Sequence, residues 1–171
     1  KYTGIDIRQE QIDSNREQAI KILPVNNQPQ WYVGDSNELL SSGEWNMDFD
    51  MVFSCPPYGD LEKYSDLDGD ISNMPYPKFL ERYETIIHKS CRLLKNGGYA
   101  CFVVGEIRDK NGYYIGFVPD TIRAFEKCGM RYYNEGILLN SIASASIRAC
   151  GNMKNKKLVK IHQNVLVFKK P

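Results

Sequence analysis

The sequence predicts an α/β fold in which a mainly parallel sheet is covered by helices on both faces. Short apolar stretches alternate with segments of helical spacing along most of the chain, a pattern typical of strands connected by helices. The last two apolar stretches are joined by a long basic connection, and we expect them to form an antiparallel pair at one edge. A length of 171 residues and a hydrophobic content of 42% suit a single domain over residues 1–171.

The first half of the chain predicts three strands and two helices. Apolar residues at helical spacing end at Pro24, which closes the first helix because proline cannot continue it. The next strand ends at Gly34-Asp35, and Ser36 is positioned to cap a second, short helix. The expected strands are 2–6, 31–33 and 49–53, and the expected helices are 9–23 and 36–40.

The second half begins with an acidic stretch, residues 59–75, where the periodic pattern lapses and we expect a mobile surface loop. Asn96-Gly97-Gly98 is expected to stop the helix that follows, since these residues tolerate a left-handed backbone. Gly129 is expected to end the next helix. The expected helices are 76–94 and 117–128, and the expected strands are 99–104, 132–139 and 164–168.

Composition bears on nucleic-acid contact, on disulfides and metal sites, and on membrane segments. A net charge of +1 gives no overall basic field, so contact with nucleic acid must come from a local patch. The five cysteines are widely spaced without a paired motif, which favours reduced thiols over disulfides or a zinc site, and we predict no metal. No apolar run approaches the roughly 18 residues that cross a membrane, and no signal peptide is visible. We therefore expect a cytoplasmic protein without a membrane partner.

Residues 49–58 carry the strongest functional signal. A buried apolar strand leads directly into Pro56-Pro57 and then Tyr58. The two prolines lack an N–H and fix φ, so they end the strand in a stiff turn. Open α/β sheets bind ligands at the carboxyl ends of their strands, and such a turn can hold a planar group that carries an amine. The alternative is an ordinary strand-terminating turn with a core tyrosine.

Asp6 and Asp35 each follow a predicted strand. Parallel strands with right-handed crossovers bring their carboxyl ends to one edge of a sheet, so we expect both carboxylates beside the turn at 54–58. One carboxylate can accept two hydrogen bonds from a ribose diol, and the other can accept one from an adenine amine. The alternative for each aspartate is to cap the helix that follows.

The order of these segments resembles the amino-group DNA methyltransferases, which methylate adenine N6 or cytosine N4 with S-adenosylmethionine. The similar segments are Gly4-Ile5-Asp6, Gly34-Asp35 and residues 54–58. Phage and bacterial DNA-modification enzymes, including those of restriction–modification, are also similar at residues 93–98, 125–130 and 162–168. The resemblance implies a Rossmann-like methyltransferase fold, double-stranded DNA as partner, and the cytoplasm of a bacterium or phage-infected host cell.

The resemblance also implies roles for single residues. In the family the target base is flipped out of the duplex. Cys55 and the Pro56 carbonyl would accept hydrogen bonds from its amine, Pro57 would complete the rigid turn, and Tyr58 would stack on the base. Positioning and electrostatics then drive transfer without a covalent nucleophile. The residues expected to hold the cofactor are Asp6, Ile7, Asp35, Ser36 and Ser54.

Two features depart from the family. Cys55 replaces the usual aspartate, asparagine or serine, and a thiol is a poorer acceptor, which leaves adenine versus cytosine open. The chain also opens on a strand, at Lys1, without a glycine-rich loop before Asp6. We therefore expect a cut amino terminus with the first strand outside the chain, and weak or no binding of S-adenosylmethionine by this chain alone.

DNA contact is expected from the basic connection at residues 141–160. Its cations can bind phosphates, although a solvated surface loop explains them equally well. Residues 59–73 could close over a flipped base with Leu61 or Tyr64, and His162 is expected to be a structural histidine at a strand end. The expected phosphate contacts are Arg148, Lys154, Lys156, Lys157 and Lys160.

Two other functions stay open. Methyltransferases that act on RNA guanine or protein glutamine carry a similar Pro-Pro-Tyr or Pro-Pro-Phe turn, but that turn usually begins with asparagine, which this chain lacks. A degenerate domain that binds DNA or a partner without transferring methyl is favoured by Cys55 and the absent loop. The intact Asp6, Asp35 and Pro-Pro-Tyr turn oppose that reading.

Overall fold

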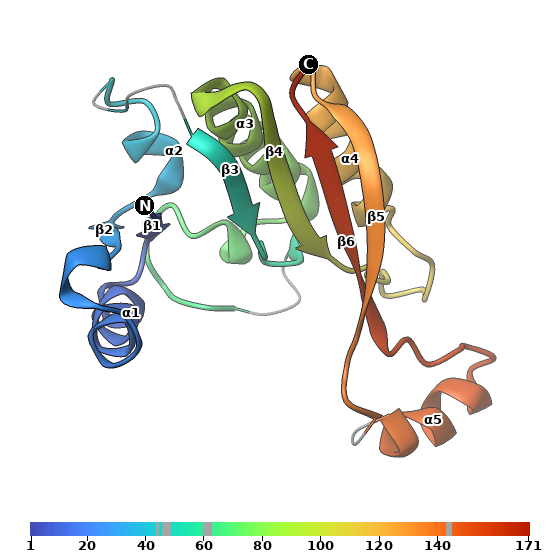
Figure 1. Cartoon of the computed structure of the whole chain (residues 1–171). Helices are drawn as coiled ribbons and strands as arrows, with labels where there is room; N and C mark the ends of the chain where they lie inside the picture. The colour runs from blue at the N-terminus through green and yellow to red at the C-terminus, as the bar shows by residue number, and fades with distance from the viewer. Residues whose placement is uncertain (44, 46–48, 60–62, 143–144) are drawn as a thin grey trace.

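The computed structural model describes residues 1–43, 45, 49–59, 63–142 and 145–171. Strands and helices alternate along the chain as the sequence predicts (Figure 1). The strands are β1 (Thr3–Asp6), β2 (Gln30–Val33), β3 (Phe49–Ser54), β4 (Leu94–Val104), β5 (Arg131–Leu139) and β6 (His162–Lys169). The helices are α1 (Gln9–Ile22), α2 (Ser36–Leu39), α3 (Tyr76–Leu93), α4 (Phe117–Lys127) and α5 (Ala145–Lys154), with short 3₁₀ turns at Val25–Asn27 and Ile71–Asn73.

The described strands form two sheets. β1 and β2 pair in parallel, and the larger sheet has the order β3-β4-β6-β5. β3 and β4 are parallel, with Ser54 opposite Phe102, whereas β6 is antiparallel to both β4 and β5. The antiparallel pair expected at one edge is therefore confirmed, and the fold is mixed α/β.

An aromatic core joins the larger sheet to α3 and α4, which lie side by side against it (Figure 1). On α3, the buried residues Phe79, Tyr83 and Ile87 recur every fourth position, which gives the helix one apolar face. Phe125 of α4 stacks on Phe168 of β6, with ring centroids 4.1 Å apart. Because the core fixes β4 and β6 against both helices, it also fixes where these strands end.

The other face of β3 is open. Met51 and Phe53 are 51% and 55% exposed, while Val52, which alternates with them, packs against the core. α1 packs on β1 and β2 instead. The helices expected on both faces of one sheet are thus divided between two sheets in the described part of the chain.

The helix predicted at 76–94 ends within one residue of α3, but its predicted stop and the predicted start of the next strand at residue 99 are wrong. α3 ends at Leu93, and Asn96-Gly97-Gly98 lies in β4 instead of stopping the helix. Leu94 already has an extended backbone, with ψ 139°, and its side chain is buried in the core. β4 therefore begins directly after the last residue of α3. Gly97 has φ +79°, and its N–H donates to the Lys170 carbonyl at 3.0 Å.

The acidic stretch at 59–75 is not a solvated loop throughout. Asp70 and Ser72 are buried, and Asp70 accepts hydrogen bonds from the Ser65 hydroxyl at 2.6 Å and the Ser72 N–H at 2.9 Å. These local bonds compensate for burying a carboxylate. The prediction that Leu61 closes over a base lies outside the described residues.

The basic connection at 141–160 contains α5, a helix that the sequence did not predict. Figure 1 shows α5 beyond one end of β5 and β6, separate from the other helices. Within the described ranges, no helix combines the length and the apolar character required to cross a bilayer.

Candidate active site

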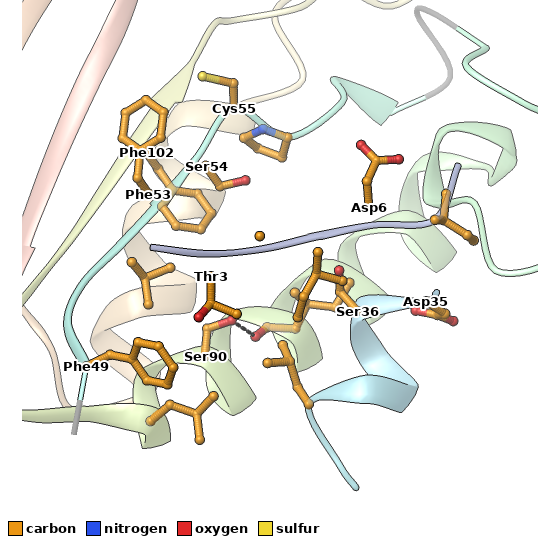
Figure 2. A pocket seen from close by; sticks show the side chains of 18 of the residues that line it. Thr3, Asp6, Asp35, Ser36, Phe49, Phe53, Ser54, Cys55, Ser90 and Phe102 are labelled. Carbon is orange, nitrogen blue, oxygen red and sulfur yellow. Dashed lines mark hydrogen bonds between the residues drawn. The ribbon is translucent and has the colours of Figure 1, made fainter. Parts of the chain in front are cut away.

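A cleft of about 900 Å³ lies between the two sheets. Strand β1 and strand β3 line its opposite sides, and residues of α3, including Tyr83 and Ile86, also line it. Figure 2 shows Asp6, Ser54 and Cys55 along one side of β1, with Phe49 and Ser90 on the other.

The cleft gathers nearly all the residues predicted for the site. The strand-end reasoning explains this, because Asp6 is the last residue of β1, Asp35 follows β2 and the Pro-Pro turn follows β3. Among the described residues predicted for the turn and the cofactor, Tyr58 alone does not line it. The predicted residues in the cleft wall are Asp6, Ile7, Asp35, Ser36, Ser54, Cys55, Pro56 and Pro57.

Asp6 presents a carboxylate to the cleft. Its Oδ1 accepts a hydrogen bond from the Arg8 N–H at 2.8 Å and lies 3.6 Å from the Arg8 Nε. Arg8 precedes the first residue of α1, and no side chain caps this helix. Because both contacts fall on Oδ1, Oδ2 can accept hydrogen bonds from a ligand.

Asp35 is held more tightly than Asp6. Its Oδ1 accepts from the Asn37 N–H at 2.7 Å, which makes Asp35 the cap of α2. The prediction that Ser36 caps this helix is therefore wrong, and the capping alternative is confirmed for Asp35. Its Oδ2 accepts from the Arg82 Nη2 of α3 at 2.5 Å. The carboxylate is thus fixed in one orientation at the cleft wall.

The backbone of Gly69 also lies close to the Asp35 carboxylate. Gly69 has φ +90°, and a Cβ added there would lie 2.7 Å from Asp35 Oδ2. Only glycine fits this approach without displacing the carboxylate. Tyr64, Gly69 and Ile71 line the cleft from the same segment, so the stretch that follows the Pro-Pro turn forms one of the cleft walls.

Cys55 is exposed and carries a free thiol. Burial of part of its side chain raises the pKa of the thiol above its ordinary value, so the group is protonated near neutral pH. A protonated thiol is a weak acceptor. An amine bound at this turn must therefore rely on a backbone carbonyl or on another acceptor.

Tyr58 faces away from the cleft residues. Its ring centroid lies 5.7 Å from that of Phe117, and its hydroxyl accepts a hydrogen bond from the Gln163 amide. A Cβ at Gly105 would lie 3.4 Å from the ring. Tyr58 is half-buried and packs against the core, which supports the alternative of a core tyrosine. Its stacking on a base stays a prediction.

A second cavity of about 410 Å³ lies near Tyr58 and shares no lining residue with the cleft. Glu106 lines it, two residues beyond the end of β4. Sequence reasoning missed Glu106, although the rule that selected Asp6 and Asp35, an acid after a strand, applies equally to it. The remaining lining residues are Tyr114, Val118, Pro119, Leu158, Val159, Lys160, His162 and Asn164.

The five predicted phosphate-binding residues do not form one group. Arg148, Lys154 and Lys156 are exposed in α5 or just after it. The Lys157 side chain packs against Gly112, and Lys160 lines the second cavity. Burial lowers the pKa of Lys160, an effect that the charge of Glu106 partly opposes. Three of the five cations are therefore exposed, and the other two are partly buried.

No family model matches the chain, and no curated protein matches its sequence. Solved structures do match. TTHA0409 of Thermus thermophilus, a DNA modification methylase solved with S-adenosyl-L-methionine, is 22% identical with a TM-score of 0.58, over 81% of this chain and 54% of its own. The cytosine-N4-specific PvuII DNA methyltransferase is 20% identical with a TM-score of 0.61, over 82% of this chain and 48% of its own.

The fold is shared more widely than the reaction. The [4+2]-cyclase SpnF is 15% identical with a TM-score of 0.59, over 99% of this chain and 66% of its own. A common fold therefore does not fix the chemistry. This chain spans about half the length of each of the two DNA methylases. What these likenesses show is that the chain has the Rossmann-like fold of the S-adenosylmethionine-dependent methyltransferases.

Proposed function

We propose that the chain carries the active site of a methyltransferase that transfers a methyl group from S-adenosylmethionine to the exocyclic amine of adenine (N6) or cytosine (N4) in double-stranded DNA. The observation that carries this proposal is the convergence of three strand ends on one cleft. Asp6, Asp35 and the Ser54–Pro57 turn come from separate strands, and their side chains line the same space. The DNA methylases among the structural neighbours support the same substrate class.

The residues present fit the nucleoside part of the cofactor. Asp6 has a carboxylate oxygen available for ribose hydroxyls, and Asp35 with Ser36 borders the same cleft. When bound, S-adenosylmethionine supplies an electrophilic methyl group on sulfur. Ile7 and Ser54 complete the predicted cofactor contacts from two other points of the wall.

The turn after β3 would bind the acceptor amine. Pro56 lies two residues beyond the end of β3, outside the sheet ladder, so its carbonyl can accept a hydrogen bond from the base. Accepting from the amine increases electron density on its nitrogen and orients its lone pair toward the methyl group. Cys55 adds little to this, because its thiol is protonated near neutral pH.

A second candidate is a domain that keeps the fold and binds DNA without transferring methyl. The weak acceptor at Cys55 and the core contacts of Tyr58 favour it. A third candidate is methyl transfer to RNA or to protein glutamine, because enzymes of that kind carry a similar Pro-Pro turn. The three functions differ in what becomes methylated.

The decisive experiment measures tritiated methyl transfer by the natural protein that contains this sequence. Duplex DNA, RNA and total protein are the three acceptors, and the Pro57→Ala variant is the control for catalysis at the turn. Label in wild-type reactions with DNA, lost in Pro57→Ala, is the expected result. Label in RNA or protein alone would overturn the DNA substrate, and label in none would favour the binding domain.

A further inference from the structure

Residues 107–115, in the connection between β4 and α4, form a tight hairpin, which we call the 107–115 hairpin. The Asp109 N–H donates to the Tyr113 carbonyl at 2.9 Å, and the Tyr113 N–H donates to the Asp109 carboxylate at 2.9 Å. Between them, the Gly112 N–H donates to the Asp109 carbonyl at 2.9 Å. Gly112 has φ +90°, a conformation that favours glycine. These bonds hold the tip of the hairpin in one shape.

Two cations stabilise the hairpin through their side chains. The Arg108 guanidinium lies over the Tyr114 ring, 3.8 Å from its centroid, and donates to the Gly112 carbonyl at 2.6 Å. The Lys157 ammonium lies so close to Gly112 that a Cβ added there would be 2.4 Å from it. Because Lys157 follows α5, this contact joins the hairpin to the basic connection that was predicted to bind phosphates.

The hairpin presents an aromatic ring and positive charge to solvent. Tyr113 is 73% exposed, and Lys110 beside it in the turn is exposed as well. The one acid of the hairpin, Asp109, accepts the Tyr113 N–H within the turn. A ring fixed on a rigid turn loses little conformational freedom on binding. Lysines that bind phosphates and a ring that stacks on bases are the features that suit a nucleic acid.

The hairpin begins beside the Pro-Pro-Tyr turn. A Cβ added at Gly59, the residue after Tyr58, would lie 3.8 Å from the Ile107 Cδ1. The Tyr58 ring lies against Gly105, two residues before Ile107. Figure 1 shows the connection from β4 to α4 (yellow) beyond the end of β4, with α5 farther out at the same end of the sheet. The turn, the hairpin and α5 therefore share one end of the sheet.

The hairpin tip lies within reach of DNA that is bound at the turn. Asn111, in the tip, follows Ile107 by four residues, and at about 3.3 Å per extended residue it lies within about 13 Å of Ile107. Successive bases of one strand are about 3.4 Å apart, so this distance spans about four base pairs. Extrusion of a base leaves its neighbours and its partner without a stacking contact, and an exposed ring can stack on them.

We propose that the 107–115 hairpin is a DNA-binding element, in which Tyr113 stacks on a base exposed by extrusion of the target and Lys110 binds the phosphate backbone. This inference rests on the proposed function and deepens it, because it assigns DNA contact to residues that the sequence did not single out. No residue of the hairpin lines the cleft, so its role concerns DNA and leaves binding of S-adenosylmethionine unchanged.

The test measures fluorescence anisotropy of two labelled DNAs with the natural protein that contains this sequence. One DNA is a fully paired duplex, and the other is the same duplex with a central bubble of unpaired bases. Wild-type protein should bind the bubble about fivefold or more tightly, the effect of stacking on one base. Tyr113→Ala should bind both DNAs equally, whereas Tyr113→Phe, which keeps the ring, should retain the preference.

The matched control is Tyr133→Ala. Tyr133 is 53% exposed, and its ring lies against that of Tyr99, near the start of β4 and thus at the other end of the sheet. Its bubble preference should equal that of the wild type. The ratio of the two affinities does not depend on the fraction of protein that is folded, so a loss confined to Tyr113→Ala reports the ring and not stability.

Salt dependence separates the charge from the ring. Lys110→Ala should lower the slope of log affinity against log salt by about 0.9 on the paired duplex, the effect of losing one phosphate contact. Tyr113→Ala should leave that slope unchanged, because stacking releases no counterion. A wild-type slope in Lys110→Ala would remove this lysine from the DNA interface.

The outcomes distinguish the inference from the function beneath it. If wild-type protein methylates DNA and Tyr113→Ala keeps the bubble preference, the role of the hairpin alone is refuted. If wild-type protein methylates no DNA but Tyr113→Ala loses the preference, methyl transfer fails and the hairpin inference stands. If wild-type protein neither binds nor methylates DNA, both fail.

Discussion

Arg82 of α3 donates a hydrogen bond to Asp35, 47 residues earlier in the chain, with its Nη2 2.5 Å from the Asp35 Oδ2. Asp35 caps α2 with its other oxygen, so one side chain joins the end of β2, the start of α2 and the middle of α3. The pair is mostly shielded from water, with side-chain exposures of 30% and 15%. The aspartate at the cleft is therefore a structural element as well as a candidate cofactor ligand.

Replacing Arg82 tests this dual role. Arg82→Met leaves Asp35 Oδ2 without its donor, and we expect a loss of about 1–3 kcal/mol in the free energy of unfolding. Urea unfolding measures it. Arg92→Met, at an exposed position in the last turn of the same helix, is the matched control and should change stability little. Equal stability of the two variants would show that the Arg82 contact contributes nothing.

Substitutions in the Pro-Pro-Tyr turn test its chemistry. Cys55→Ser replaces a weak acceptor by a better one of similar size, so methyl transfer to DNA should be kept or increased. Pro57→Ala and Tyr58→Ala should abolish transfer, the latter because it removes a ring that packs the turn against the core and that we expect to stack on the base. Single-turnover transfer of tritiated methyl measures each, with Cys150→Ser as the control for an exposed cysteine. Loss of transfer in Cys55→Ser alone would assign the thiol a direct role.

Asp70 should make stability depend on pH in the acid range. Burial raises the pKa of Asp70, but hydrogen bonds from Ser65 and Ser72 outweigh it, and the net pKa lies below the ordinary 3.8. A carboxyl whose folded pKa is lowered stabilises the protein above its unfolded pKa and loses that contribution as pH falls through the folded pKa.

The Asp70→Asn variant isolates this contribution. Its deficit in unfolding free energy relative to wild type should be largest at pH 7 and should shrink below pH 3.8. Unfolding in urea at both ends of that range measures the change. Asp68→Asn, at an exposed position of the same segment, is expected to show no such deficit. A deficit of Asp70→Asn that stays constant with pH would exclude the carboxylate charge as its cause.

The exposed cations near α5 should set the salt dependence of DNA binding. Removing one phosphate contact lowers the slope of log affinity against log salt by about 0.9. We expect this change for Lys154→Ala, measured by fluorescence anisotropy at several salt concentrations. Lys21→Ala, in the last turn of α1, should leave the slope unchanged. Identical slopes for the two variants would remove α5 from the DNA interface.

The sequence predicted the strand ends well because each strand carries its own local signal. Apolar runs followed by Asp6, Asp35 or Pro56-Pro57 define both the strand and its polar end. Their meeting at one cleft then follows from the handedness of the crossovers. Glu106 carries the same signal, since one glycine separates it from the end of β4 just as Gly34 separates Asp35 from the end of β2.

What the sequence could not predict depends on contacts between distant segments. The side-chain direction of Tyr58 is set by Phe117 and by Gln163, which is 105 residues away, and no local pattern encodes those partners. Burial of Asp70 depends on hydrogen bonds within a polar stretch that reads as a loop. α5 lacks a clear apolar face, and only Ala145 of this helix is buried, so its periodicity gave no signal.

The most direct test of the account is the affinity of S-adenosylmethionine for the natural protein and for its Asp6→Asn variant, measured by titration calorimetry. Asp6 would accept hydrogen bonds from the ribose hydroxyls through the oxygen that Arg8 leaves open. Asparagine turns that charged acceptor into a neutral amide. We expect binding by the wild type and an affinity about tenfold or more lower in Asp6→Asn. Equal affinities, or no binding by the wild type, would contradict the assignment of this cleft to the cofactor.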